Sequence, residues 1–244
     1  MNTDIIYGRN PVLEAIKAGR EIDKIYIKNT EVDGSLKKVL GAAKAAKIVV
    51  SRVDRKKLDA LCEGENHQGI VATVAQHAYC TVEDILKIAD EKGEKPFIVI
   101  CDKISDPHNL GSIIRTANAA GAHGVIIPKH ESVGLSATVA KVSAGAVEFT
   151  PVARVNNLAS VIEKLKKEGF WITGAAMGGD KTLFEADLEG SVALVIGSEG
   201  FGISRNVLEK CDFVVSIPMK GETESLNASV AAALLMYEVM RRRS

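Results

Sequence analysis

The sequence has few cysteines and no excess of charge of either sign. Its four cysteines, Cys62, Cys80, Cys101 and Cys211, are scattered. They form no CxxC pair, and no histidine lies near them at metal-ligand spacing. This pattern argues against a disulfide framework or a zinc site and favours a reducing compartment. The 31 basic and 31 acidic side chains cancel, which excludes a chain that is basic throughout but not a local basic patch.

Long apolar runs and the common hydrolytic motifs are also missing. No apolar stretch reaches the ~18 residues of a membrane span, and the first ten residues lack the basic-then-apolar order of a signal peptide. We therefore expect a cytoplasmic protein. No GxGxxG, HExxH, paired carboxylates or Ser-His-Asp set is present, so a Rossmann dehydrogenase and a hydrolase both have little support.

Helix-like and strand-like runs alternate through the first 76 of the 244 residues. Asn10 is a candidate N-cap, with Pro11 at the first helical position and Gly19 as the terminator. This alternation predicts a small layered α/β unit over residues 1–76. The expected helices cover 10–19, 35–47 and 54–62, and the expected strands cover 23–28, 48–53 and 68–75.

A polar, charged connection is expected over residues 77–95, with one helix at 81–93 that Gly93 stops. A second α/β series then fills residues 96–244. Its strand candidates are continuously apolar, which fits a sheet covered by helices on both faces. The expected strands are 97–104, 123–128, 147–152, 171–176, 192–198 and 212–219, and the expected helices are 109–120, 136–145, 156–168, 204–210 and 227–242.

The first of three segments that could carry chemistry is DKISDPHNLGSIIRTANAAG, residues 102–121. Its apolar residues recur at the spacing of one helical face. Asn109 stands near the start of this expected helix, and Arg115 points roughly 140° away from Leu110 on a helical wheel with about 100° per residue. Asn109 is therefore either an N-cap or part of a site, and Arg115 is either a solvated charge or a functional group.

The second segment is IGSEGFGIS, residues 196–204, which follows an expected buried strand. Glycines at the carboxyl end of such a strand let the backbone approach a ligand closely. Glu199 would repel a pyrophosphate, so a ligand with a cationic or hydrogen-donating part fits better. An ordinary glycine-rich turn with an exposed Glu199 is the alternative. Ser204 is expected to cap the next helix.

The third segment is GETESLNASVAAALL, residues 221–235. Asn227 is a candidate N-cap for the last helix. Capping explains one polar residue, but it does not explain why Ser225, Asn227 and Ser229 stand together. The small alanine side chains that follow predict close packing of this helix against another backbone or a second subunit.

Taken together, these segments resemble motifs one, two and three of the SpoU/TrmH branch of the SPOUT methyltransferases, in the family's order. The N-terminal IIYGRNPVLEAIKAGREIDKIYI and NHQGIVA resemble the substrate-recognition domain of the RlmB-like subfamily, which are 23S ribosomal RNA guanosine-2′-O-methyltransferases. The resemblance implies an α/β protein. Residues 96–244 would form a parallel sheet with a deep trefoil knot, and residues 1–76 an RNA-binding domain similar to ribosomal protein L30e.

The resemblance also implies S-adenosyl-L-methionine as cofactor, a homodimer built through the C-terminal domain, and no metal. The residues at the family's catalytic-centre positions are Asn109, Arg115, Glu199, Ser225 and Asn227. The residues at its cofactor positions are Gly197, Ile217 and Leu226, with Ala176 and Met177 in a neighbouring loop.

The implied reaction is attack of a ribose 2′-hydroxyl on the methyl group of the cofactor. Arg115 would act either as a transient base, desolvated by burial, or as a cation that stabilises the developing alkoxide. Arg9, Arg20, Lys24 and the basic side chains of 52–57 would contact RNA phosphates, or they are merely solvated surface groups. A transfer RNA substrate and a non-catalytic RNA-binding relative are the alternative functions.

Overall fold

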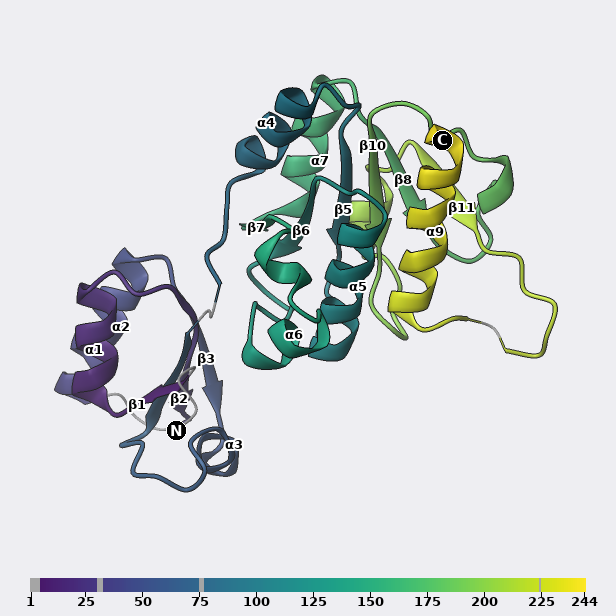
Figure 1. Cartoon of the computed structure of the whole chain (residues 1–244). Coiled ribbons are helices and arrows are strands. Elements are labelled where there is room, and N and C mark those ends of the chain that lie inside the picture. The colour runs from purple at the N-terminus through teal and green to yellow at the C-terminus, as the bar shows by residue number, and fades with distance from the viewer. Residues whose placement is uncertain (1–4, 30–32, 75–76, 224) are drawn as a thin grey trace. The chain divides into compact units, whose positions relative to one another are not determined.

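The computed structural model describes residues 5–29, 33–74, 77–223 and 225–244 (Figure 1). The chain divides into two compact units, and the first chain boundary between them follows Ala78. An α/β fold with two parts, as the sequence predicts, is confirmed. In the described ranges, none of the helices combines the length and the apolar character that a membrane span requires.

The N-terminal unit is a four-stranded mixed sheet with helices on both faces. Strands β1 and β2 each pair with β4 in antiparallel fashion, and β2 pairs with β3 in parallel, which gives the order β1-β4-β2-β3. Ile70 and Ala72 of β4 join the core beneath α1 and α2, whereas Val71 between them packs beneath α3. The elements are β1 (Ile5–Tyr7), α1 (Arg9–Lys17), β2 (Ile22–Lys28), α2 (Gly34–Ala45), β3 (Val49–Val53), α3 (Arg55–Leu61) and β4 (Ile70–Val74).

Two details at the start of this unit differ from the sequence prediction. Strand β1 was not expected, because a strand of three residues is too short to show an alternating pattern. Helix α1 begins at Arg9, so Asn10 is not its N-cap. Gly8 takes that position with φ of 90°, a conformation that side chains other than glycine rarely adopt.

The C-terminal unit is built on a seven-stranded sheet in the order β7-β6-β5-β10-β8-β11-β9. Every neighbouring pair in this sheet is parallel. Its strands are β5 (Phe97–Cys101), β6 (Gly124–Pro128), β7 (Val152–Val155), β8 (Trp171–Ala175), β9 (Lys181–Thr182), β10 (Val192–Ile196) and β11 (Phe213–Ser216). Its helices are α4 (Val82–Lys92), α5 (Pro107–Ala119), α6 (Ala137–Val142), η1 (Ala146–Glu148), α7 (Leu158–Lys167), η2 (Leu183–Glu185), α8 (Arg205–Leu208) and α9 (Ala228–Arg243).

Helices cover both faces of this sheet, as continuously apolar strands require. On one face, α4, α7 and α8 contribute Ile85, Ile162 and Val207 to a single apolar core. On the other face, α5 packs against α9, and α9 contacts β10 (Figure 1). The buried positions Leu110 and Ile114 of α5 match the predicted apolar face of that helix.

The expected connection at 77–95 is not a free linker. Its predicted helix exists as α4, with a capping box at Thr81 and Asp84 and a left-handed Gly93 at its end. However, Ile85 is fully buried in the C-terminal core. Because α4 packs as part of the C-terminal unit, that unit begins earlier in the chain than residue 96.

The strand expected at 147–152 is also wrong over most of its length. Residues 146–148 form the 3-10 turn η1 after Gly145, which has φ of 84°, and Val147 packs in the interior as part of that turn. Pro151 has no N–H to donate to a neighbouring strand, and β7 begins only at Val152. The short strand β9 was not expected.

Candidate active site

Three polar side chains from distant parts of the sequence meet beyond the carboxyl end of the large sheet. The amide nitrogen Nδ2 of Asn109 donates to Glu199 Oε1 at 3.1 Å. Asn227 Nδ2 donates to Asn109 Oδ1 at 2.9 Å and also to Glu199 Oε1. We call these three residues the amide–carboxylate network. It joins the three segments that the sequence singled out as candidates.

The Asn109 side chain is available to this network because another residue, Asp106, caps helix α5. Asp106 is the N-cap of α5, its side chain accepts the N–H of His108, and Pro107 fills the first helical turn. The N-cap alternative for Asn109 is therefore wrong. Asn109 is only 6% exposed, so its amide needs internal partners, and Glu199 and Asn227 supply them.

Glu199 sits in a tight turn whose ends are hydrogen-bonded to each other. Ser198 N–H donates to Gly202 O at 3.0 Å, and Gly202 N–H donates back to Ser198 O at 2.9 Å. A Cβ on Gly197 would lie 2.1 Å from the carbonyl carbon of Gly202, so this close approach requires glycine at position 197. The turn fixes the backbone from which Glu199 reaches the network.

Asp102, which the sequence analysis did not select, anchors the far side of the same turn. Its buried carboxylate accepts the N–H of Ser204 at 2.6 Å. Ser204 is the N-cap of α8, as predicted, but its side chain makes no capping hydrogen bond. An aspartate directly after the buried strand β5 was the available signal, since strand ends of this kind line ligand sites.

Asn227 has two roles in the fold, one for each end of its side-chain amide. Its Oδ1 accepts the N–H groups of Ser229 at 2.9 Å and Val230 at 3.4 Å, which confirms the predicted cap of α9. These contacts assign the oxygen, so the Nδ2 group is the one that faces Asn109 and Glu199. The cap thus orients the amide toward the network.

The expected cofactor residues lie at one edge of the sheet. Register places Val195 of β10 opposite Gly174 of β8, and Val215 of β11 opposite Ala175. The residues that follow these strands, Ala176, Gly197 and Ile217, therefore come to adjacent carboxyl ends. This is where open parallel sheets bind ligands. Small or apolar side chains with accessible backbone suit a cofactor that combines an adenine ring, a ribose and a charged amino acid part.

Leu226 and Met177, the other two expected cofactor residues, differ in exposure. Leu226 is half-buried one residue before the Asn227 cap, so its backbone is held close to the network. Met177 is 70% exposed beyond the end of β8. The chain therefore offers a largely exposed thioether and a partly covered isobutyl group at these two positions.

Arg115 and Ser225 are not drawn into the amide–carboxylate network. Both are exposed, and within the described ranges neither side chain has a hydrogen bond or an ion pair. Arg115 lies on α5 six residues after Asn109, which is about 9 Å along the helix axis. Burial within one chain therefore does not desolvate Arg115, contrary to the condition that the transient-base role needs.

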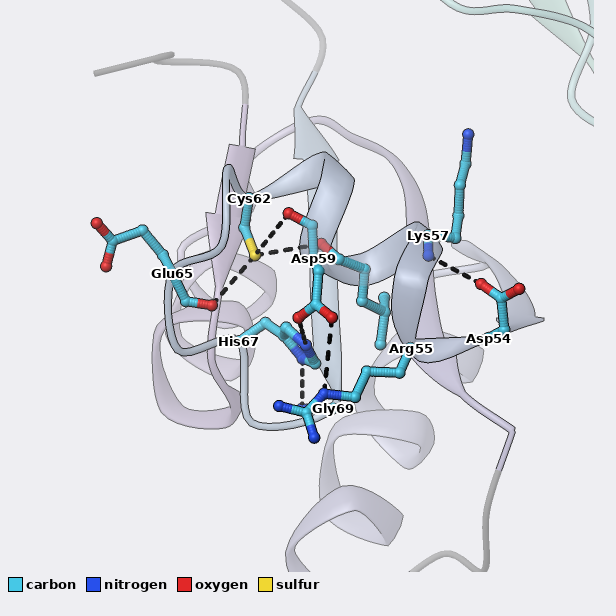
Figure 2. Close-up of polar contacts among 9 residues, drawn as sticks. Asp54, Arg55, Lys57, Asp59, Cys62, Glu65, His67 and Gly69 are labelled. Carbon is cyan, nitrogen blue, oxygen red and sulfur yellow. Dashed lines mark hydrogen bonds and ion pairs between the residues drawn. The ribbon is translucent and has the colours of Figure 1, made fainter.

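In the N-terminal unit, the contacts of His67, which Figure 2 shows, are those of a structural residue. His67 Nδ1 accepts the N–H of Gly69 at 2.8 Å, which leaves the ring proton on Nε2, 3.0 Å from Asp59 Oδ1. Arg55 approaches the other oxygen of Asp59 at 3.6 Å. These contacts hold the turn that leads into β4.

The basic residues expected to contact RNA differ in how far their own chain already engages them. Arg9 pairs with Asp33 at 2.7 Å and donates to the carbonyl of Gln68 at 3.1 Å. Lys24 stands 5.4 Å from the ring centroid of Tyr26. Arg20 is exposed. Arg9 therefore has a structural role, whereas Arg20 keeps the exposure that a phosphate contact needs.

Burial makes at least two of the four cysteines poor nucleophiles. All four are free thiols. Burial raises the pKa of Cys80 to about 11 and the pKa of Cys101 to about 12, so the reactive thiolate is scarce at neutral pH. No group of three or more candidate ligands gathers in the part of the chain that the structure describes.

Two family models match this chain, and together they identify an RNA methyltransferase with a substrate-binding unit. The model of the SpoU rRNA Methylase family matches residues 96–237, and the model described as RNA 2′-O ribose methyltransferase substrate binding matches residues 5–80. The chain belongs to the SpoU family of RNA methyltransferases.

Relatives and solved structures agree with this membership. A protein of Bacillus subtilis (strain 168), named as a TrmH family tRNA/rRNA methyltransferase, is 49% identical over 99% of this chain and 96% of its own length. The solved SpoU methyltransferase AviRb from Streptomyces viridochromogenes, in complex with AdoMet, is 26% identical with a TM-score of 0.62, over 98% of this chain and 90% of that one. A solved A. aeolicus TrmH/SpoU tRNA modifying enzyme is 26% identical with a TM-score of 0.56, over 66% of this chain and 83% of that one.

The family identifies the cofactor and the general chemistry. The protein uses S-adenosyl-L-methionine, and its substrate is RNA. The three motifs and the N-terminal stretches quoted from the sequence fall inside the two matched ranges.

Proposed function

We propose that this protein transfers the methyl group of S-adenosyl-L-methionine to the ribose 2′-hydroxyl of a guanosine in 23S ribosomal RNA. The observation that carries the proposal is the amide–carboxylate network of Asn109, Glu199 and Asn227 at the carboxyl edge of the sheet. It joins the three motif segments next to the strand ends where Gly197 and Ile217 lie. Cofactor and ribose can thus be held against the same set of polar groups.

The bound cofactor supplies an electrophilic methyl group on a sulfonium, which is already a good leaving group. The protein therefore has to align the attacking oxygen and to exclude water. Backbone groups at Gly197, Ile217 and Leu226, with Ala176 and Met177 nearby, hold the cofactor in this proposal.

The network positions the groups that face the ribose. Glu199 fixes the amides of Asn109 and Asn227, and their orientation limits where the ribose hydroxyls can be bound. Ser225 lies two residues before the Asn227 cap and positions the loop that enters α9. The reacting hydroxyl gives up its proton to solvent water as its oxygen bonds to the methyl carbon and the methyl–sulfur bond breaks.

Arg115 acts as the cation that stabilises the developing alkoxide and a neighbouring phosphate. A guanidinium is charged at any physiological pH and donates up to five hydrogen bonds in a planar fork. Its exposure in a single chain leaves those donors available to RNA. Removal of water around Arg115 then comes from the RNA or from a second copy of the chain.

Ribosomal RNA is favoured over transfer RNA because of the N-terminal unit. The match to the AviRb structure spans 98% of this chain, whereas the match to the A. aeolicus tRNA modifying enzyme spans 66%. A chain with a full substrate-binding unit therefore has more surface for a large, structured RNA. In this proposal, RNA phosphates are contacted by Arg20, Lys24 and the basic residues of 52–57. Arg9 stabilises the unit that carries them through its contacts with Asp33 and Gln68.

A homodimer through the C-terminal unit completes the proposal. Val230, Leu234 and Tyr237 recur at helical spacing on α9 and are 47%, 43% and 46% exposed. An apolar stripe of this kind is suited to a partner surface, and a second copy is its occupant. The trefoil knot in residues 96–244, the L30e-like character of residues 1–76, a place in ribosomal RNA processing and a cytoplasmic site of action remain proposals that rest on the motif resemblance.

The substrate assignment is tested by mapping 2′-O-methyl groups on ribosomal and transfer RNA from cells with and without the protein. We expect one guanosine of 23S ribosomal RNA to lose its methyl group, and a plasmid copy of the wild-type sequence to restore it. A copy with Arg115→Ala should not restore it. Loss confined to a transfer RNA position would favour the alternative substrate, and no loss anywhere would favour a non-catalytic relative.

A further inference from the structure

Phe201 is held almost entirely in water beside the amide–carboxylate network. Its side chain is 95% exposed, against 78% for Phe149 and 60% for Phe184. Burying a phenylalanine side chain is worth roughly 1.5–3 kcal/mol. Any partner that covers the exposed ring therefore lowers the free energy. The position of Phe201 beside the network indicates which kind of partner covers it.

The turn that carries Phe201 is closed by hydrogen bonds at its two ends. These two hydrogen bonds join Ser198 and Gly202. Gly200 and Gly202 adopt φ values of 82° and 65°, and Gly197 is pressed against Gly202. The ring thus projects from a fixed backbone rather than from a loose tail, so less ordering entropy is lost when a ligand covers it.

The ring also stands close to the proposed reaction centre. Phe201 follows Glu199 by two residues, so their Cα atoms are at most about 7 Å apart. Glu199 accepts hydrogen bonds from Asn109 and Asn227. A ligand that covers the ring can therefore also reach the network with an adjoining group.

The charge next to the Phe201 ring determines which part of an RNA can cover it. The Glu199 carboxylate in the same turn repels phosphate, so the sugar–phosphate backbone is a poor partner for this position. The π face of an unpaired nucleobase carries no net charge and stacks on aromatic side chains in RNA complexes. The other residues of the turn are Ser198 and glycines, so within it Phe201 is a single ring rather than part of an apolar patch.

We propose that Phe201 is a base-stacking residue, which holds an unpaired nucleobase of the substrate RNA next to the ribose that receives the methyl group. This inference rests on the proposed function, because the network must be the place where that ribose binds. Stacking of this kind is tolerant of sequence. It would hold the RNA in register while other contacts choose the nucleotide.

Steady-state methyl transfer with Phe201 variants tests the proposal. Base stacking on an aromatic is worth about 1–3 kcal/mol, so Phe201→Ala should lower kcat/KM for RNA by about 5- to 150-fold, mainly through KM. The affinity for S-adenosyl-L-methionine and the sedimentation coefficient should not change. Phe201→Tyr should restore most of the loss because it keeps a ring.

Phe184→Ala is the matched control. It removes another exposed phenyl ring. The Phe184 carbonyl accepts a hydrogen bond from Arg242, which lies at the end of α9 opposite the Asn227 cap. We expect wild-type kinetics from it. An unchanged KM for Phe201→Ala would overturn the proposal. So would a loss of dimer or of cofactor affinity, since the ring would then serve a protein or cofactor contact.

A binding measurement separates this proposal from the proposed function. Trp171 is the only tryptophan, so a Trp171→Phe, Phe201→Trp double variant reports from position 201 alone. A single-stranded RNA oligonucleotide should quench its fluorescence, and a fully paired duplex should quench it less. No difference between the two RNAs would overturn the stacking. If quenching occurs but the wild type methylates no ribose, the proposed function fails while stacking stands.

Discussion

The replacement Asn227→Asp separates the two roles of Asn227. Aspartate caps helices as well as asparagine does, so Oδ1 can still accept the N–H groups of Ser229 and Val230. The Nδ2 donor, however, becomes an oxygen that faces Glu199 and the Oδ1 atom of Asn109. The substitution therefore keeps the start of α9 and breaks the network.

The expected cost follows from the geometry. Two hydrogen bonds are lost, one of them to a charged group, at about 0.5–3 kcal/mol each. Two carboxylates about 4 Å apart repel by about 1 kcal/mol in water and by about 4 kcal/mol at an effective dielectric constant of 20. Glu199 and Asn227 are both exposed, so solvent screening keeps the total near the lower end of the summed terms, at about 2–4 kcal/mol.

Urea unfolding and single-turnover methyl transfer measure the two consequences. At pH 7 we expect Asn227→Asp to lower the free energy of unfolding by this amount and methyl transfer by more than about tenfold. Adding Glu199→Gln should restore stability at pH 7, because it removes the repulsion, but not activity. An Asn227→Asp protein with wild-type stability and rate would refute this account of the network.

Four further predictions concern single residues. The hydrogen bond that Glu238 accepts from Arg241 holds the pKa of Glu238 at about 2. The stability from this ion pair is therefore complete above the unfolded-state pKa near 4.3 and is lost as pH falls toward 2. Glu238→Gln should cost about 1–3 kcal/mol at pH 7 in urea unfolding, and the same cost at pH 2 would contradict the reasoning. Burial lowers the pKa of His123, so the unfolded state binds more protons and stability should fall as pH drops below about 6.5; thermal unfolding of His123→Gln should lack that slope. Gly197→Ala should weaken cofactor binding more than about tenfold by calorimetry, since its Cβ would strike the Gly202 backbone. Arg115→Lys keeps one charge but loses the planar fork, so the rate should fall about 10- to 1,000-fold with cofactor affinity unchanged; a near wild-type rate would exclude both roles considered for Arg115.

Most of the sheet could be predicted from sequence because its strands are buried on both sides. A run such as Val192–Ile196 is apolar at every position and only five residues long, which fits an inner strand buried on both faces. The prediction failed at 147–152, where Val147 is buried in a 3-10 turn rather than a strand. Apolar character indicates burial there, but it does not identify the local conformation.

The site could be predicted only in part. Helix rules identified Asn227 as a cap, and that is confirmed. They also offered Asn109 as a cap, which is wrong because Asp106 and Pro107 start the helix three residues earlier. In the network, Asn109 contacts Glu199, which is 90 residues away along the chain, and Asn227, which is 118 residues away. No local periodicity encodes such a contact, so only the order of the three motifs indicated it.

Methyl transfer by the purified protein tests the central claim most directly. The protein is incubated with S-adenosyl-L-methionine labelled in the methyl group and with unmodified 23S ribosomal RNA, and the RNA is digested to nucleosides. We predict label on the 2′-oxygen of guanosine, and none with the Arg115→Ala protein under the same conditions. Label on a base, on transfer RNA alone, or on no RNA at all would contradict the account.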